Sequence, residues 1–127
     1  MIIDEVAEYL EGELTGYTIG TNLFKAFQPD EPDNCITILD TGGATPDRYL
    51  PTAEPTFQIL VRNIQYPDAG TICKAIVSAL HNKYNLELVS GETYFYAINL
   101  MGEPGYIDKD NKNRYEFSMN FISHIRR

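Results

Sequence analysis

The alternation of apolar and polar residues is clearest in the stretch from Pro55 to Tyr84. Leu60 interrupts the polar face of its first part, which favours a strand inside a sheet with much of both faces covered. Asp68 then stands where a helix N-cap is favoured. The pattern predicts a buried strand followed by a helix that packs back on the sheet, because the apolar residues recur first with a two-residue period and then at helical spacing: Phe57, Ile59 and Val61, then Ile72, Ile76, Ala79 and Leu80.

A second amphipathic helix is predicted from Ile2 to Leu14. Its apolar residues recur every three or four positions, and its acidic residues lie on the opposite side and toward the N-terminal end, where the helix dipole favours them. Gly16 is a plausible terminator. The apolar stripe consists of Ile3, Val6, Leu10 and Leu14.

Several further segments have the pattern of strands. The last one has aromatic and apolar residues at alternate positions from Tyr115 to Phe121 and is expected at the middle of its hairpin group. Residues 86–89 fit either a strand or a linker. The order of elements predicts one domain, 1–127, of the α+β class, with a mostly antiparallel (mixed) sheet and two amphipathic helices. The remaining strands are expected at Leu23–Phe27, Cys35–Asp40, Tyr94–Met101 and Tyr106–Ile107.

Charge and composition narrow the classes of function. The chain has 127 residues and a net charge of -8, and all of this excess lies in residues 1–63. Direct binding to a nucleic-acid backbone is disfavoured, because such proteins need a basic face. No apolar run is long enough for a membrane span. Cys35 and Cys73 fall in a strand pattern and a helix pattern, and we expect reduced, buried thiols there.

One motif resembles a catalytic site. Asp40-Thr41-Gly42 follows two apolar residues, as in the active-site turn of aspartic proteases. However, Gly43 stands where that family has Ser or Ala, and two helices are too many for a nearly all-β protease. The alternative is that Asp40 ends a strand and the glycines open a loop. The polar segment Asp108–Asn113 lacks the glycine of a calcium loop. We therefore predict no catalytic residues, no cofactor and no metal.

Three segments together resemble the minor capsid proteins of tailed bacteriophages, of the tail terminator or head–tail joining type. They are Pro29–Gly43, Pro55–Tyr66 and Arg114–His124. The resemblance implies a structural virion protein without enzymatic activity. It further implies a homo-oligomeric ring, hexameric by the same resemblance, that contacts head-connector and tail-tube proteins. DNA would pass through the ring, with no sequence-specific binding. Assembly would take place in the host bacterial cytoplasm, and the final location would be the virion.

The segment from Thr41 to Pro55 shows no periodicity and is expected to be a long working loop. Because head-to-tail contacts in a ring join two different surfaces, such a loop is a candidate contact. Its central residues, Arg48, Tyr49 and Leu50, are the predicted subunit interface, since Tyr and Arg often anchor interfaces. An aspartic-type hydrolase acting through Asp40 is the alternative function. A strict dimer in solution would favour the hydrolase and a larger ring the structural subunit.

Overall fold

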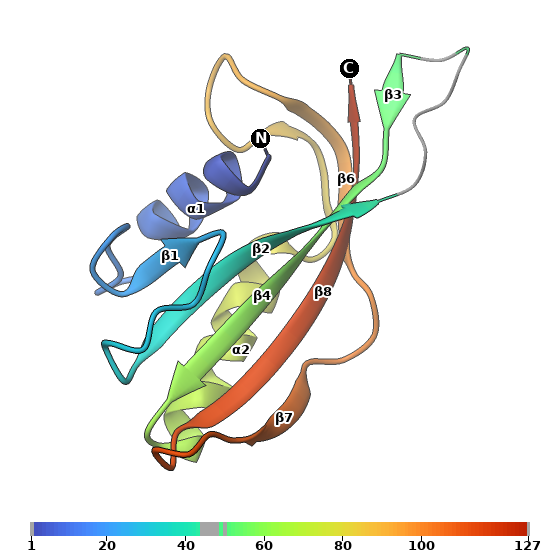
Figure 1. The fold of residues 1–127 in the computed structure, drawn as a ribbon. Helices are drawn as coiled ribbons and strands as arrows, with labels where there is room; N and C mark the ends of the chain where they lie inside the picture. Colours follow the sequence, from blue (N-terminus) through green and yellow to red (C-terminus); the bar gives the residue numbers. More distant parts are fainter. Residues whose placement is uncertain (1, 44–48, 50, 127) are drawn as a thin grey trace.

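The computed structural model describes residues 2–43, 49 and 51–126. The described chain forms two helices and an eight-stranded mixed sheet, with strand order β1-β2-β4-β8-β6-β5 and with β3 and β7 also paired to β8 (Figure 1). Only β1 and β2 pair in parallel. The predicted α+β class is confirmed. The elements are α1 (Ile2–Glu13), β1 (Leu23–Lys25), β2 (Cys35–Gly43), β3 (Thr52–Ala53), β4 (Pro55–Asn63), α2 (Tyr66–Leu80), β5 (Lys83–Glu87), β6 (Tyr94–Leu100), β7 (Gly105–Lys109) and β8 (Tyr115–Arg126).

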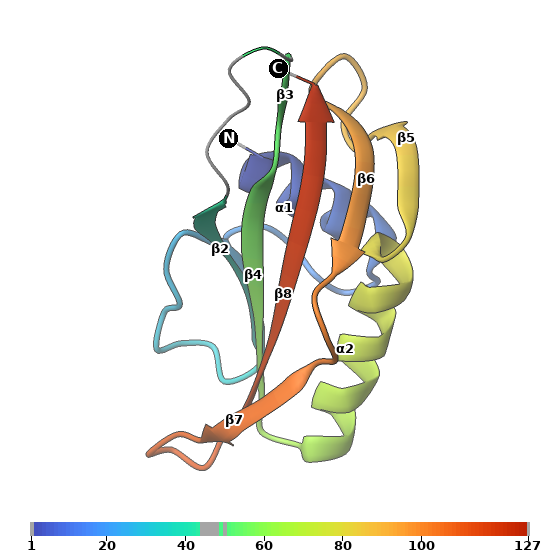
Figure 2. The same ribbon diagram turned by 90° about the vertical axis from the view of Figure 1, so that its right-hand side faces the viewer.

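The hydrophobic core lies between the sheet and the two helices, which both cover the same sheet face (Figures 1 and 2). The alternate apolar residues of β4 lie directly opposite those of β8, and Phe57 stacks on Phe121 with 5.2 Å between ring centroids. This is the face predicted from the two-residue period. The buried core residues on the helices are Ile3, Val6, Ala7 and Leu10 of α1 and Ala69, Cys73, Ile76 and Leu80 of α2.

The last strand, β8, is central, as the pattern predicted. It pairs with β4 along one edge, and on the other edge with β7 near its start and with β6 near its end. Strand β3 continues the register of β4 along β8, so that Thr52 lies opposite Arg126. Consequently β3 and β4 act as one long strand that is interrupted at Glu54.

Some predicted details are wrong. Helix α2 begins at Tyr66 with Gln65 as N-cap and without a side-chain cap, so Asp68 lies within the first turn. The reason is Pro67, whose fixed φ and missing N–H suit the first turn of a helix. Residues 86–89, for which the sequence left a strand or a linker open, belong partly to each: Leu86 and Glu87 end β5, which starts at Lys83, and Leu88 and Val89 follow it. Strand β4 lies inside the sheet, as predicted, and both helices cover one of its faces. On the other face Arg62 is buried against the carbonyl of Pro32, whereas Gln58 and Leu60 are half-buried, so the second face is covered only in part.

Candidate functional site: assembly surfaces

The segment expected to be a loop, Thr41–Pro55, is largely the end of a β-hairpin. Strand β2 continues through Gly43, which lies opposite Pro55, and β3 pairs with the end of β8. The Thr41 and Thr56 hydroxyls are 2.6 Å apart across the strands. We call residues 41–43 and 52–55 of this segment the arm. Backbone hydrogen bonds between strands hold the arm together, and they impose no apolar periodicity, so the sequence pattern did not reveal it.

In the sequence, the predicted interface residues stand between β2 and β3, and the structure describes one of them, Tyr49. The side chain of Tyr49 is 87% exposed. Arg48 and Leu50 lie outside the described residues. At the base of the arm, the Ser123 hydroxyl donates a hydrogen bond to the Pro55 carbonyl at 2.8 Å. The structure therefore places Tyr49 at the end of an arm anchored on the central strand β8.

We expected Asp40 to end its strand, but this is wrong: Asp40 lies at a bulge within β2, which continues to Gly43. The register with β4 shifts between Asp40 and Gly42, and the Gly42 N–H donates to the Asp40 carboxylate at 2.8 Å. The side chain is otherwise exposed. This local contact gives Asp40 a role in shaping the bulge.

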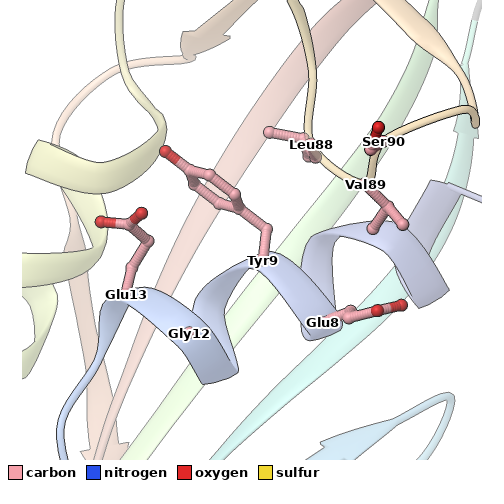
Figure 3. A pocket seen from close by; sticks show the side chains of 7 residues that line it. All are labelled: Glu8, Tyr9, Gly12, Glu13, Leu88, Val89 and Ser90. Atoms are coloured by element: carbon pink, nitrogen blue, oxygen red, sulfur yellow. The ribbon is translucent and has the colours of Figure 1, made fainter.

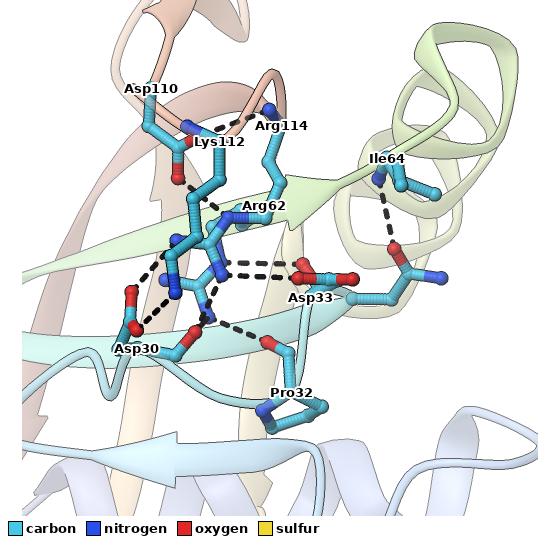
Figure 4. A network of polar contacts seen from close by, with 9 residues as sticks. Asp30, Pro32, Asp33, Arg62, Ile64, Asp110, Lys112 and Arg114 are labelled. Atoms are coloured by element: carbon cyan, nitrogen blue, oxygen red, sulfur yellow. Dashed lines mark hydrogen bonds and ion pairs between the residues drawn. The ribbon is translucent and has the colours of Figure 1, made fainter.

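Two arginines join distant parts of the chain at the lower end of the sheet, where β4 ends and β8 begins (Figure 4). Arg114 is only 3% exposed, and its guanidinium donates to the Asp110 carboxylate at 2.6 Å and to the Asp33 carboxylate at 3.3 Å. It also contacts the Asp30 carboxylate at 3.1 Å. Arg62, likewise buried, donates to the Pro32 carbonyl at 2.6 Å. The cluster fixes the turn before β2 against the β7–β8 hairpin.

Charge pairing in this cluster lowers the pKa of two carboxyl groups. Hydrogen bonds from Lys112 and then Arg114 lower the pKa of Asp30. Burial by itself raises the pKa of Asp110, but hydrogen bonds from Arg114 outweigh it and the pKa is lowered. These carboxylates are therefore stabilised in their charged form by folding. This cluster was not predicted from the sequence. The features that could have pointed to it are two arginines, one in β4 and one just before β8, and the acidic turn before β2.

We expect the stability of the protein to fall below about pH 4. A carboxyl whose pKa is lower when folded contributes stability above its unfolded pKa, ordinarily 3.8 for Asp, and loses it as the pH falls through the folded value. Replacing Arg114 with Met removes the charged partner of Asp110 and one of the two partners of Asp30, which keeps Lys112, so the pH dependence should become less steep. Urea denaturation between pH 2.5 and pH 7 measures it. The matched control is Lys109→Met, a cation on β7; equal pH profiles for Arg114→Met and wild type would contradict the pairing.

A cluster of aromatic residues lies near the same end of the molecule, on the helix side of the sheet. Tyr66 from α2 contacts three rings of β7 and β8, namely Tyr106, Tyr115 and Phe117, with centroid distances of 5.4–6.0 Å. Tyr66 and Tyr106 are each about half exposed. The cluster closes the end of the core and presents aromatic surface to solvent.

An open groove runs between α1 and the segment after β5 (Figure 3). Glu8, Tyr9 and Glu13 line it from the helix, and Leu88 and Val89 line it from the other side. Burial, followed by the charge of Glu13, raises the pKa of Tyr9. Apart from Tyr9 and Ser90, the groove presents only the carboxylates of Glu8 and Glu13 and the apolar side chains of Leu88 and Val89, and we assign it no catalytic role.

The described residues provide few other candidates for chemistry. Among them, no three His, Cys, Asp or Glu side chains are grouped so that they could hold a metal ion. In the same part of the chain, no helix has the length and apolar character needed to cross a membrane. Cys35 and Cys73 are buried and unbonded, as expected, and burial raises the pKa of Cys73 to about 11.

Comparison with known proteins gives two findings. A family model described as bacteriophage tail terminator protein matches residues 11–127. A chain from the solved structure of the virion of a native gene transfer agent particle has a similar fold, with a TM-score of 0.64 and 13% sequence identity. The match covers 96% of this chain and 84% of that one. No curated protein matches this sequence.

Proposed function

This chain belongs to the bacteriophage tail terminator family, and from this premise we propose that it is a non-enzymatic ring subunit in the virion of a tailed phage. The observation that carries the proposal is the family match, which spans nearly the whole chain from residue 11. The fold shared with a chain of a gene transfer agent virion supports it. The ring would be a head-to-tail homo-oligomer, and a hexamer is the form we propose.

The proposed neighbours of the ring are the head connector on one side and the tail tube on the other. The net charge of -8 would keep DNA from adhering to the subunits, because carboxylates repel phosphates. DNA would then pass through the ring without sequence-specific contacts.

We propose that the end of the β2–β4 hairpin, with Arg48, Tyr49 and Leu50, forms part of the contact between subunits. Tyr49 is a large side chain that is almost fully exposed on an arm fixed to β8. An aromatic residue in such a position gains most when a partner covers it. The arm therefore provides one of the two different surfaces that a head-to-tail ring requires.

Replacing both Tyr49 and Leu50 with Ser is expected to give a folded monomer that no longer forms rings. The reason is that two apolar anchors are lost from the contact while the core is unchanged. Light scattering after size-exclusion chromatography at several concentrations measures the assembly. The control is Tyr84→Ser on the edge strand β5, where an exposed tyrosine is removed far from the hairpin. A double variant that assembles like wild type would exclude the hairpin end from the contact.

A further inference from the structure

The sheet face opposite the helices is free of charge over its central part. Strand register places eight side chains there, and none of them is charged, although 22% of the chain is charged. Neither helix covers this face (Figure 2). Of the eight residues, Thr37 of β2 is fully buried, and the other seven are Leu39 of β2, Thr56, Gln58 and Leu60 of β4, and Ser118, Asn120 and Ile122 of β8. We call them the open face.

Charged residues border the open face at both ends. Arg62 and Glu116 lie opposite each other on β4 and β8 at its lower end. At its upper end, His124 lies 3.4 Å from the Glu54 carboxylate. An uncharged centre with a charged border is the usual composition of a protein contact surface, in which charge is depleted at the core and retained at the rim.

The size of the open face limits what it can bind alone. Three strands about 4.8 Å apart and five residues long, at about 3.3 Å per residue, give an area of roughly 250 Å². A standard contact buries about 800 Å² on each partner. The open face can therefore form the centre of such a contact, and the rim must supply the rest.

The chain itself carries a surface that suits this face. The outer side of α1 carries Asp4, Glu8 and Glu13, and burying these carboxylates against uncharged groups would be costly. The outer stripe of α2 carries one carboxylate, Asp68, which lies in the first turn of the helix on the same side as Ala75. Its other exposed residues are small or uncharged apart from one cation, Lys74, which complements Glu116 on the rim of the open face. The stripe consists of Pro67, Asp68, Thr71, Lys74, Ala75 and Ser78.

We propose that the open face of one subunit receives the outer stripe of α2 from the next copy of the chain. The two surfaces lie on opposite sides of a molecule with two layers, sheet and helices (Figure 2). Each copy can therefore use both surfaces at once, and the contact repeats head to tail. This inference rests on the proposed self-assembly and specifies the surfaces that form it.

The test blocks each surface separately with one charge. Asn120→Lys places a cation at the centre of the open face, where the contact would bury it against uncharged groups. Ser78→Lys places a second cation in the α2 stripe, so that the two modified surfaces carry like charges and repel each other. Both positions are exposed in the subunit, so the variants should fold like the parent, as thermal melts monitored by circular dichroism will show. Should Asn120→Lys not fold, Gln58→Lys, its cross-strand neighbour, replaces it.

Each variant alone is expected to remain a monomer at concentrations where the parent is assembled. An equimolar mixture should form a dimer with one copy of each variant, because one junction is intact: the unmodified α2 stripe of the Asn120→Lys chain against the unmodified open face of the Ser78→Lys chain. The other junction would place two cations together and stays closed. Native mass spectrometry identifies this dimer by its mass. Thr15→Lys and Ser90→Lys are the matched controls, since they add the same charges at exposed sites outside both surfaces.

The outcomes separate this contact from self-assembly as such. Assembly of either variant at the level of the parent would overturn the contact, and so would a mixture that contains only monomers. In both cases the parent still assembles and the proposed function stands. A parent that stays monomeric at every concentration would contradict self-assembly and the contact together.

Discussion

Replacing Phe121 with Ala is expected to lower the free energy of unfolding by about 3–5 kcal/mol, the range for removal of a fully buried phenylalanine ring. Phe121 is completely buried at the centre of β8 and stacks on Phe57 with an angle of 9° between the ring planes. Removal of the ring would leave a cavity beside β8, the strand that pairs with both β4 and β6, and therefore in the middle of the sheet. The surrounding strands are held by cross-strand pairing and have little freedom to fill it.

Urea denaturation at low protein concentration measures this effect, because oligomerisation would otherwise add to the apparent stability. Ile107→Ala is the matched control: it also shortens a large apolar side chain, but Ile107 is 53% exposed on β7. We expect the control to change stability by about 0.5 kcal/mol or less. A loss below about 1.5 kcal/mol for Phe121→Ala would contradict the position of β8 at the centre of the core.

The sequence revealed those elements that bury one apolar side. The alternation in β4 and β8 and the helical stripes of α1 and α2 gave the correct elements and most of the core residues, because packing against the sheet requires that periodicity. Leu14, Ile72 and Ala79 are only half-buried, and the stripes missed the small buried residues Ala7, Ala69 and Cys73. Strand β3 and the end of β2 do not bury such a side. Their order comes from backbone pairing with β8 and β4, which imposes almost no pattern on the side chains.

The arginine cluster could not be predicted from local patterns. Arg62 and Arg114 are far apart in sequence: Arg62 takes an ordinary polar position in its strand, and Arg114 belongs to the charged segment just before β8. The acidic turn from Pro29 to Asn34 has the composition of an ordinary exposed turn. Only the register of β4 and β8 brings these three segments together, and that register was not determined by the sequence pattern.

The open face was hidden for a related reason. Gln58, Ser118 and Asn120 look like the solvent side of two strands, and only Leu60 interrupts that pattern. The sequence shows neither strand order nor which face the helices cover. Once the register is known, the absence of charge across β2, β4 and β8 becomes a property of one surface. Its meaning therefore depends on topology rather than on any single segment.

Replacing Gly43 with Ala is expected to disrupt the hairpin arm, whereas Gly42→Ala should be far milder. Both glycines have positive φ, 86° at Gly42 and 125° at Gly43, which is unfavourable for alanine. At Gly42 a Cβ atom would meet no other atom within 4 Å. At Gly43 it would lie 2.3 Å from the Glu54 carbonyl oxygen, so the backbones of β2 and β4 would have to separate.

We therefore expect a loss of about 1–2 kcal/mol for Gly42→Ala, from backbone conformation alone, and roughly 2–4 kcal/mol for Gly43→Ala, where the steric clash adds to it. Hydrogen exchange localises the effect: in Gly43→Ala the amides from Thr52 to Thr56 should lose protection, while those near Val61 should keep it. If the arm positions Tyr49 for assembly, Gly43→Ala should also form fewer rings than Gly42→Ala. Equal stability, exchange and assembly in the two variants would show that the close approach of Gly43 to Glu54 does not hold the arm in place.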